Sequence, residues 1–113
     1  MMLIAVTAAG QELPWTQTLE RSNEASAKAQ PDLAVSLVEC AWQQVREAGP
    51  SHPAYRWGVN SVTQTFLLLG RPMRAETLYD QAIAAAQDRP ALNRDLQIMQ
   101  AEFLRGLQAR HAR

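Results

Sequence analysis

Residues 66–83 read FLLLGRPMRAETLYDQAI, and this stretch carries the clearest structural signal of the sequence. Gly70-Arg71-Pro72 interrupts it, because glycine permits the left-handed conformation that ends a helix and proline can occupy the first position of the next one. Beyond the break, Ala75, Tyr79 and Ala82 follow at steps of four and three, so they share one helix face. The two alanines let a neighbouring helix approach closely, and the aromatic side chain fills the space beside that contact. The stretch therefore predicts two helices joined by a tight turn.

The same spacing occurs earlier in the chain, at Ala34, Val38 and Ala41. The offset between the two sets is 41 residues (75 minus 34). Each set follows another segment of helical pattern and a short connector. Two identical patterns at one period predict two copies of a helix–turn–helix unit that stack side by side.

Prolines and glycines divide the rest of the chain into segments of helical length. Beyond the N-terminal segment, apolar residues recur at steps of three and four, and no stretch shows the sustained alternation that strands need. The expected helices span about residues 15–29, 32–48, 54–69, 72–87 and 91–110. The sequence thus predicts an all-α antiparallel array. Its parts are an apolar segment at residues 1–13 and one helical domain at 14–113, with hairpins at about 15–48 and 54–88 and a closing helix at about 91–110.

The segment Met1–Ala9, MMLIAVTAA, is apolar but too short to span a bilayer, which needs about 20 apolar residues. It makes a poor signal peptide, because no lysine or arginine precedes it. We expect it to pack on the domain or on a neighbouring copy, since its β-branched Ile4, Val6 and Thr7 tolerate an extended conformation. We therefore expect no membrane partner.

Cys40 is the single cysteine, so no intramolecular disulfide can form and no zinc site can rest on cysteines. It lies in the apolar run 37–42, where we expect it to be buried as a small hydrophobic residue. A chain of this kind is compatible with a reducing, cytoplasmic setting. The basic residues are arginines apart from Lys28, and alanine is abundant, a bias that GC-rich coding produces and that favours a bacterial source.

Eleven basic and eleven acidic side chains cancel, whereas nucleic-acid binders usually carry a basic excess, so we expect no nucleic-acid partner. The HExxH, GxSxG and phosphate-binding glycine motifs of common enzymes are absent from the sequence. His52 and His111 have no obvious orienting carboxylate nearby in sequence. Glu20 and Glu24 share a helix face, which we interpret as a solvated face rather than half of a metal site. We expect neither catalysis nor a cofactor or metal.

Residues 47–53, 66–72 and 75–83 together resemble a tetratricopeptide repeat, in the long variety found in kinesin light chains and many bacterial proteins. The signature positions of that family are matched in the second unit by Gly70, Ala75, Tyr79 and Ala82, and Phe66 matches the aromatic residue of the first helix. The first unit matches at Ala34 and Ala41, but it has Val38 in place of the aromatic residue and Ala29 in place of the glycine. The resemblance implies hairpins stacked as a short right-handed superhelix.

In that family, the first helix of each hairpin lines a concave groove that holds a peptide or a helix of a partner protein. The resemblance implies a groove face made of Leu19, Asn23, Ser26, Trp57, Asn60, Gln64, Leu67 and Leu68. Some relatives bind C-terminal carboxylates through lysine and arginine, and the absence of lysine from this face argues against that mode.

Each of these residues also has a structural interpretation. Trp57 either packs between the hairpins or anchors a partner, and Leu67 and Leu68 belong either to the core or to the groove. Asn60 and Gln64 are either plain solvated residues or donors to a bound backbone. Trp15 and Trp42, which adjoin helix stripes, are expected in packing contacts.

Two functions remain open from the sequence. The first is an adaptor or scaffold whose groove binds a segment of another protein. The second is a structural homo-oligomer, because repeat arrays usually need three or more units and this chain has about two and a half. We therefore expect self-association, as a two-fold dimer.

Overall fold

Five helices account for nearly all of residues 13–111, the part of the chain that this computed structural model describes. They are α2 (Pro14–Ala27), α3 (Pro31–Ala48), α4 (Tyr55–Leu68), α5 (Pro72–Ala85) and α6 (Pro90–His111), and the described range contains no strand. Proline is the first residue of every described helix except α4. At the first position of a helix, the missing N–H of proline would have had no partner within the helix anyway. The predicted all-α fold is confirmed. The expectations for Met1–Ala9 concern residues outside the described range.

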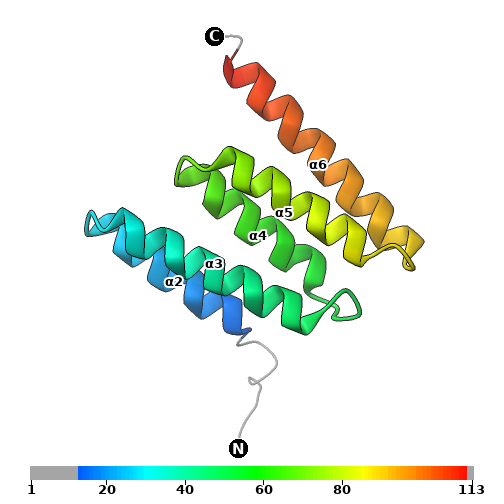
Figure 1. Cartoon of the computed structure of the whole chain (residues 1–113), viewed down its shortest axis with the longest axis horizontal. Coiled ribbons are helices and arrows are strands. Elements are labelled where there is room, and N and C mark those ends of the chain that lie inside the picture. Colours follow the sequence, from blue (N-terminus) through cyan, green and yellow to red (C-terminus); the bar gives the residue numbers. More distant parts are fainter. Residues whose placement is uncertain (1–12, 112–113) are drawn as a thin grey trace, which may run out of the picture.

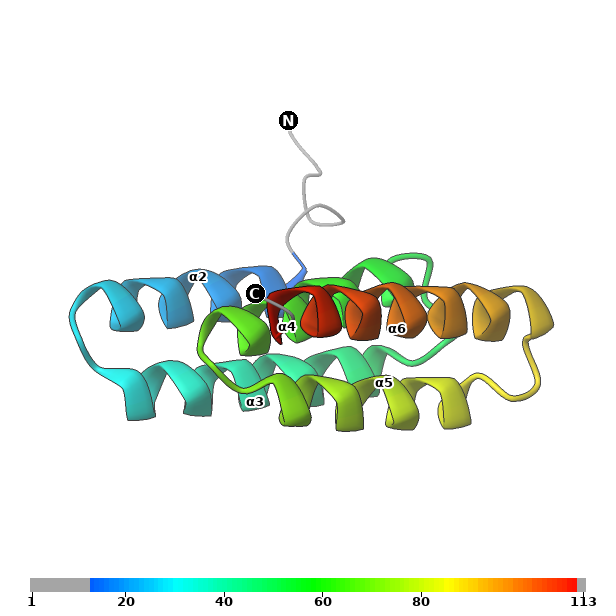
Figure 2. The same cartoon turned by 90° about the horizontal axis from the view of Figure 1, so that it is seen from above.

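The helices form two antiparallel hairpins and a closing helix. α2 pairs with α3 and α4 pairs with α5, while α6 contacts both α4 and α5 (Figure 1). Seen from above, α2, α4 and α6 form one layer, and α3 and α5 form the other (Figure 2). The first helix of each hairpin therefore lies in the same layer as α6.

The turns inside the two hairpins have the same geometry at an offset of 41 residues (70 minus 29). Gln30 N–H donates to the Ala25 carbonyl at 2.9 Å, and Arg71 N–H donates to the Phe66 carbonyl at 2.8 Å. The residue just before each donor has a positive φ, 57° at Ala29 and 76° at Gly70. Ala29 thus adopts the left-handed conformation that the repeat reserves for glycine. This shared turn is independent support for the 41-residue repeat.

The four repeat alanines make the close helix contacts that the sequence predicts. Ala34, Ala41, Ala75 and Ala82 are all fully buried, with 0% of their surface exposed. The larger core side chains around them come from all five described helices. They include Trp15, Val38, Val45, Tyr55, Val59, Val62, Phe66, Leu78, Tyr79, Leu96 and Phe103.

Trp15 and Trp42 both pack between helices, as predicted. Trp15 of α2 lies against Gly58 of α4 and contacts the His52 ring edge-on, with centroids 5.8 Å apart. Trp42 of α3 donates its indole N–H to Gln81 of α5 at 3.0 Å. These contacts join the first hairpin to the second in both layers.

The prediction that Cys40 is buried is wrong. Cys40 is an exposed residue of α3. The buried stripe of that helix passes through Val38, Ala41 and Val45. Residue 40 lies about 200° around the helix from residue 38 and about 100° from residue 41, so it falls off the stripe. Leu33, near the start of the same helix, is about half exposed.

Candidate partner-binding groove

Two adjoining hollows lie between α4 and α6. The first, of about 260 Å³, is lined by Asn60, Gln64, Leu67, Tyr79, Met99, Glu102, Phe103, Gly106, Leu107 and Arg110. The second, of about 270 Å³, is lined by Arg56, Trp57, Asn60 and Met99. Because the two share Asn60 and Met99, they form one continuous depression, which we call the α4–α6 groove.

The α4 wall of this groove is a stripe of four predicted residues. Trp57, Asn60, Gln64 and Leu67 follow at steps of three, four and three, so they lie on one helix face. The stripe covers ten residues of rise, about 15 Å. Trp57 is 50% exposed, so it stands at the groove mouth instead of being packed between the hairpins. Leu67 packs against the core and also lines the groove.

The remaining predicted residues lie elsewhere. Leu19 is only 8% exposed and belongs to the hydrophobic core. Asn23 and Ser26 are exposed on α2 but line neither hollow. Leu68 is 81% exposed near the turn between α4 and α5, also outside the groove lining. The structure therefore brings together the residues predicted on α4, except Leu68, and leaves out those on α2.

The floor of the groove is a buried tyrosine. The Tyr79 hydroxyl and Thr63 Oγ1 share a hydrogen bond of 3.2 Å, and the Tyr79 ring contacts Phe103 with centroids 5.5 Å apart. Burial raises the pKa of Tyr79, the hydrogen bonds from Thr63 and Gln64 lower it, and the negative charge of Glu102 raises it further. The floor is therefore a neutral hydroxyl held in a fixed position.

The charges around the groove balance. Arg56 of α4 pairs with Asp95 of α6 at 3.3 Å, near the Trp57 end. Glu102 and Arg110, of opposite sign, both line the other end. Counted together with Asp95, the charged groups around the groove cancel, which favours an uncharged segment over an acidic or basic peptide.

The α6 wall was not predicted as part of the site. Met99, Phe103 and Leu107 follow at steps of four, so they form an apolar stripe on one face of α6. In the structure they face the core and the groove together, because α6 diverges from α5 toward its C-terminal end (Figure 1). The one available signal is Gly106, a glycine inside a helix with nothing within 4 Å of its missing Cβ. A glycine there leaves the groove open.

Outside the groove, residues 13–111 offer little that points to other chemistry. They contain no group of three or more His, Cys, Asp or Glu side chains that could hold a metal ion. None of their helices is both long and apolar enough to cross a membrane. Comparison of the chain with protein-family models, with curated proteins and with solved structures gave no match.

Proposed function

We propose that this chain is a tetratricopeptide-like interaction module, cytoplasmic and bacterial, that binds a segment of another protein in the α4–α6 groove and carries out no catalysis itself. The observation that carries the proposal is the half-exposed Trp57 beside a groove lined by both amide and apolar side chains. Partly exposed tryptophans in depressions are frequent anchors of protein interfaces.

The shape of the groove supports a polypeptide ligand. Its two hollows, about 260 and 270 Å³, follow one another along the α4 stripe, so together they form an elongated site. Each accommodates one or two side chains. The amides of Asn60 and Gln64 can accept and donate hydrogen bonds to a peptide backbone between them.

The proposal is tested by filling the groove without disturbing the fold. Gly106→Leu places a side chain in the open space and also removes a helix-interior glycine, which favours α6 by about 1 kcal/mol. Ala101→Leu adds similar bulk at an exposed position of the same helix that lines neither hollow. Pull-downs from the source cell should lose their specific partner with Gly106→Leu and keep it with Ala101→Leu. Equal recovery with both variants would rule the groove out.

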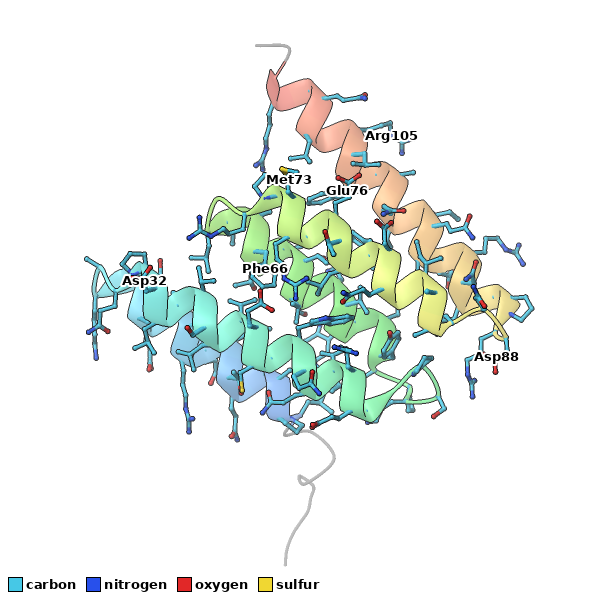
Figure 3. All side chains as sticks on the ribbon, in the orientation of Figure 1. Asp32, Phe66, Met73, Glu76, Asp88 and Arg105 are labelled. Atoms are coloured by element: carbon cyan, nitrogen blue, oxygen red, sulfur yellow. The ribbon has the colours of Figure 1, made fainter. Side chains whose placement is uncertain are left out.

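One observation favours the second candidate function, a structural homo-oligomer. Leu68 and Met73, at the turn between α4 and α5, are 81% and 80% exposed. Met73 lies at the start of α5, on the side that faces α6 (Figure 3). Light scattering of the wild type and of a Leu68→Lys, Met73→Lys variant tests this candidate. A dimer that dissociates in the variant supports it, and a monomeric wild type rejects it.

A further inference from the structure

We propose that the seam between α3 and α5 holds a binding site for a small organic carboxylate, a molecule with one carboxylate group on an apolar body. The site is a pocket of about 430 Å³, which we call the α3–α5 pocket. It lies in the layer formed by α3 and α5 (Figure 2) and shares no lining residue with the α4–α6 groove. Its lining includes Trp42, Arg46, Pro50, Tyr55, Gln81 and Ala84.

The walls of the pocket are two helix faces that lie side by side (Figure 1). Trp42 and Arg46 are four residues apart on α3, so they share one face of that helix. Gln81 and Ala84 are three residues apart on α5, so they also share a face. The Trp42 indole N–H donates to Gln81 Oε1 at 3.0 Å and closes one end of the pocket, while Pro50, beyond the C-terminal end of α3, lines the other.

These limits suit a small molecule better than a chain that runs along the seam. From Trp42 to Arg46 the helix rises only about 6 Å. The volume of about 430 Å³ lies within the range of roughly 300–1,000 Å³ that is usual for small-molecule sites.

Two arginines face the seam, and only one of them has an acidic partner among residues 13–111. Arg74 of α5 donates two hydrogen bonds of 2.7 Å to the Glu39 carboxylate of α3. Arg46 of α3 forms no ion pair with any described residue, and its guanidinium donates to Gln43 at 3.5 Å, a distance too long for a strong bond. None of the described residues that line the pocket is acidic. Arg46 therefore offers an unpaired positive charge to an anion in the pocket.

The other polar groups of the pocket are also donors. Gln81 Oε1 accepts the Trp42 N–H, which leaves the NH₂ group of Gln81 to donate to a ligand. Tyr55 is only 1% exposed, and its hydroxyl has no hydrogen-bond partner within residues 13–111. Burial raises the pKa of Tyr55, and the nearby charge of Arg46 lowers it, so the hydroxyl keeps its proton at neutral pH and lies close to the guanidinium. A guanidinium, an amide NH₂ and a phenol O–H together recognise an anionic acceptor.

The charge and the apolar surface of the pocket indicate which anion fits. A carboxylate carries one negative charge and two coplanar oxygens, which match a single guanidinium in a bidentate pair. A phosphate monoester carries about 1.5–2 negative charges, more than Arg46 alone can neutralise. Trp42, Pro50 and Ala84 supply apolar surface beside these donors, so the carboxylate is attached to an apolar group.

Fluorine NMR of para-fluorophenylacetate, titrated with the full chain, tests the site. Its neutral counterpart para-fluorophenylacetamide has the same shape without the charge and should bind more weakly by about tenfold or more. Arg46→Gln should weaken binding of the acid by a similar factor, whereas Arg94→Gln, at an exposed position of α6 outside the pocket lining, should not. Ala84→Leu should abolish binding because it fills the pocket from an exposed helix position, and Ala101→Leu should leave it unchanged.

The contrary outcomes are distinct. Equal binding of the acid and the amide, or unchanged binding in Arg46→Gln, overturns the carboxylate site, as does the lack of saturable binding up to about 10 mM, a weak limit for a ligand of this size. Displacement of the probe by an equal concentration of inorganic phosphate overturns the choice of carboxylate. Tighter binding of the tripeptide glycylglycylphenylalanine overturns the small-molecule assignment in favour of a peptide C-terminus. Gly106→Leu should bind the probe like the wild type, so this result is independent of the proposed function of the α4–α6 groove.

Discussion

Ala29 occupies a backbone conformation that suits glycine, and this gives a quantitative test of the repeat. Its φ of 57° is in the left-handed region, which costs an alanine about 1–2 kcal/mol. The equivalent residue of the second hairpin is Gly70, with φ 76° and nothing within 4 Å of its missing Cβ. Ala29 is exposed, so its methyl group contributes little packing. The two positions therefore differ in backbone strain and in little else.

Exchanging the two residue types should move stability in opposite directions. Ala29→Gly removes the strain, but it adds about 0.4–1 kcal/mol of conformational entropy to the unfolded chain. The net stabilisation should be about 0.5–1 kcal/mol. Gly70→Ala introduces the same strain without a steric clash, so it should destabilise the fold by a similar amount.

Urea denaturation followed by circular dichroism measures both changes. The transition midpoint should rise for Ala29→Gly and fall for Gly70→Ala, with the slope m unchanged, because the surface exposed on unfolding is the same. In thermal unfolding the corresponding shifts are about 3–6 °C in each direction. The double variant should return close to the wild type. A lower midpoint for Ala29→Gly, or a higher one for Gly70→Ala, would refute the equivalence of the two turns.

Two further predictions concern the helix interface and the tyrosines. Gly58→Ala should destabilise the protein by about 1–3 kcal/mol, because the new Cβ would lie 3.0 Å from Val45 Cγ2 and 3.1 Å from Trp15 Cε2. An unchanged midpoint in urea denaturation would show that α2 and α4 are not in close contact. Burial raises the pKa of both Tyr55 and Tyr79, so their contribution to stability is complete below the unfolded pKa of about 10 and is lost as the pH rises through the folded values. Because these are the only two tyrosines, tyrosinate absorbance follows them directly, and ionisation at the ordinary pH in the folded protein would contradict the prediction.

The helices could be predicted because residues close to each helix end mark where that helix begins and ends. Proline starts four of the five described helices, and proline or glycine follows closely after each of α2 to α5. The alanine spacing also predicted which faces meet, since close approach between helices requires small side chains at those positions. Cys40 shows where local composition misleads. The apolar run around it favours burial, but the spacing of Val38, Ala41 and Val45 puts residue 40 on another side of the helix.

The groove could be predicted only on its α4 side. The family resemblance implies the phase of α4, and Trp57, Asn60 and Gln64 do lie on one face of that helix. The opposite wall depends on the angle at which α6 crosses the second hairpin. That angle results from packing between distant residues, and no local pattern in α6 encodes it. An apolar stripe such as Met99 and Phe103 looks the same whether it faces a core alone or also a groove.

One of the differences between matched positions of the two hairpins bears on the proposed binding surface. Leu19 and Asn60 are 41 residues apart and therefore equivalent in the repeat (60 minus 19). Leu19 is 8% exposed and joins the hydrophobic core, whereas Asn60 is exposed and lines both hollows. A leucine at position 60 would extend the apolar lining, and an asparagine at position 19 would bury an amide among core side chains. This difference supports the proposed groove, since the matched position is part of the core in the first hairpin and part of the α4–α6 groove in the second.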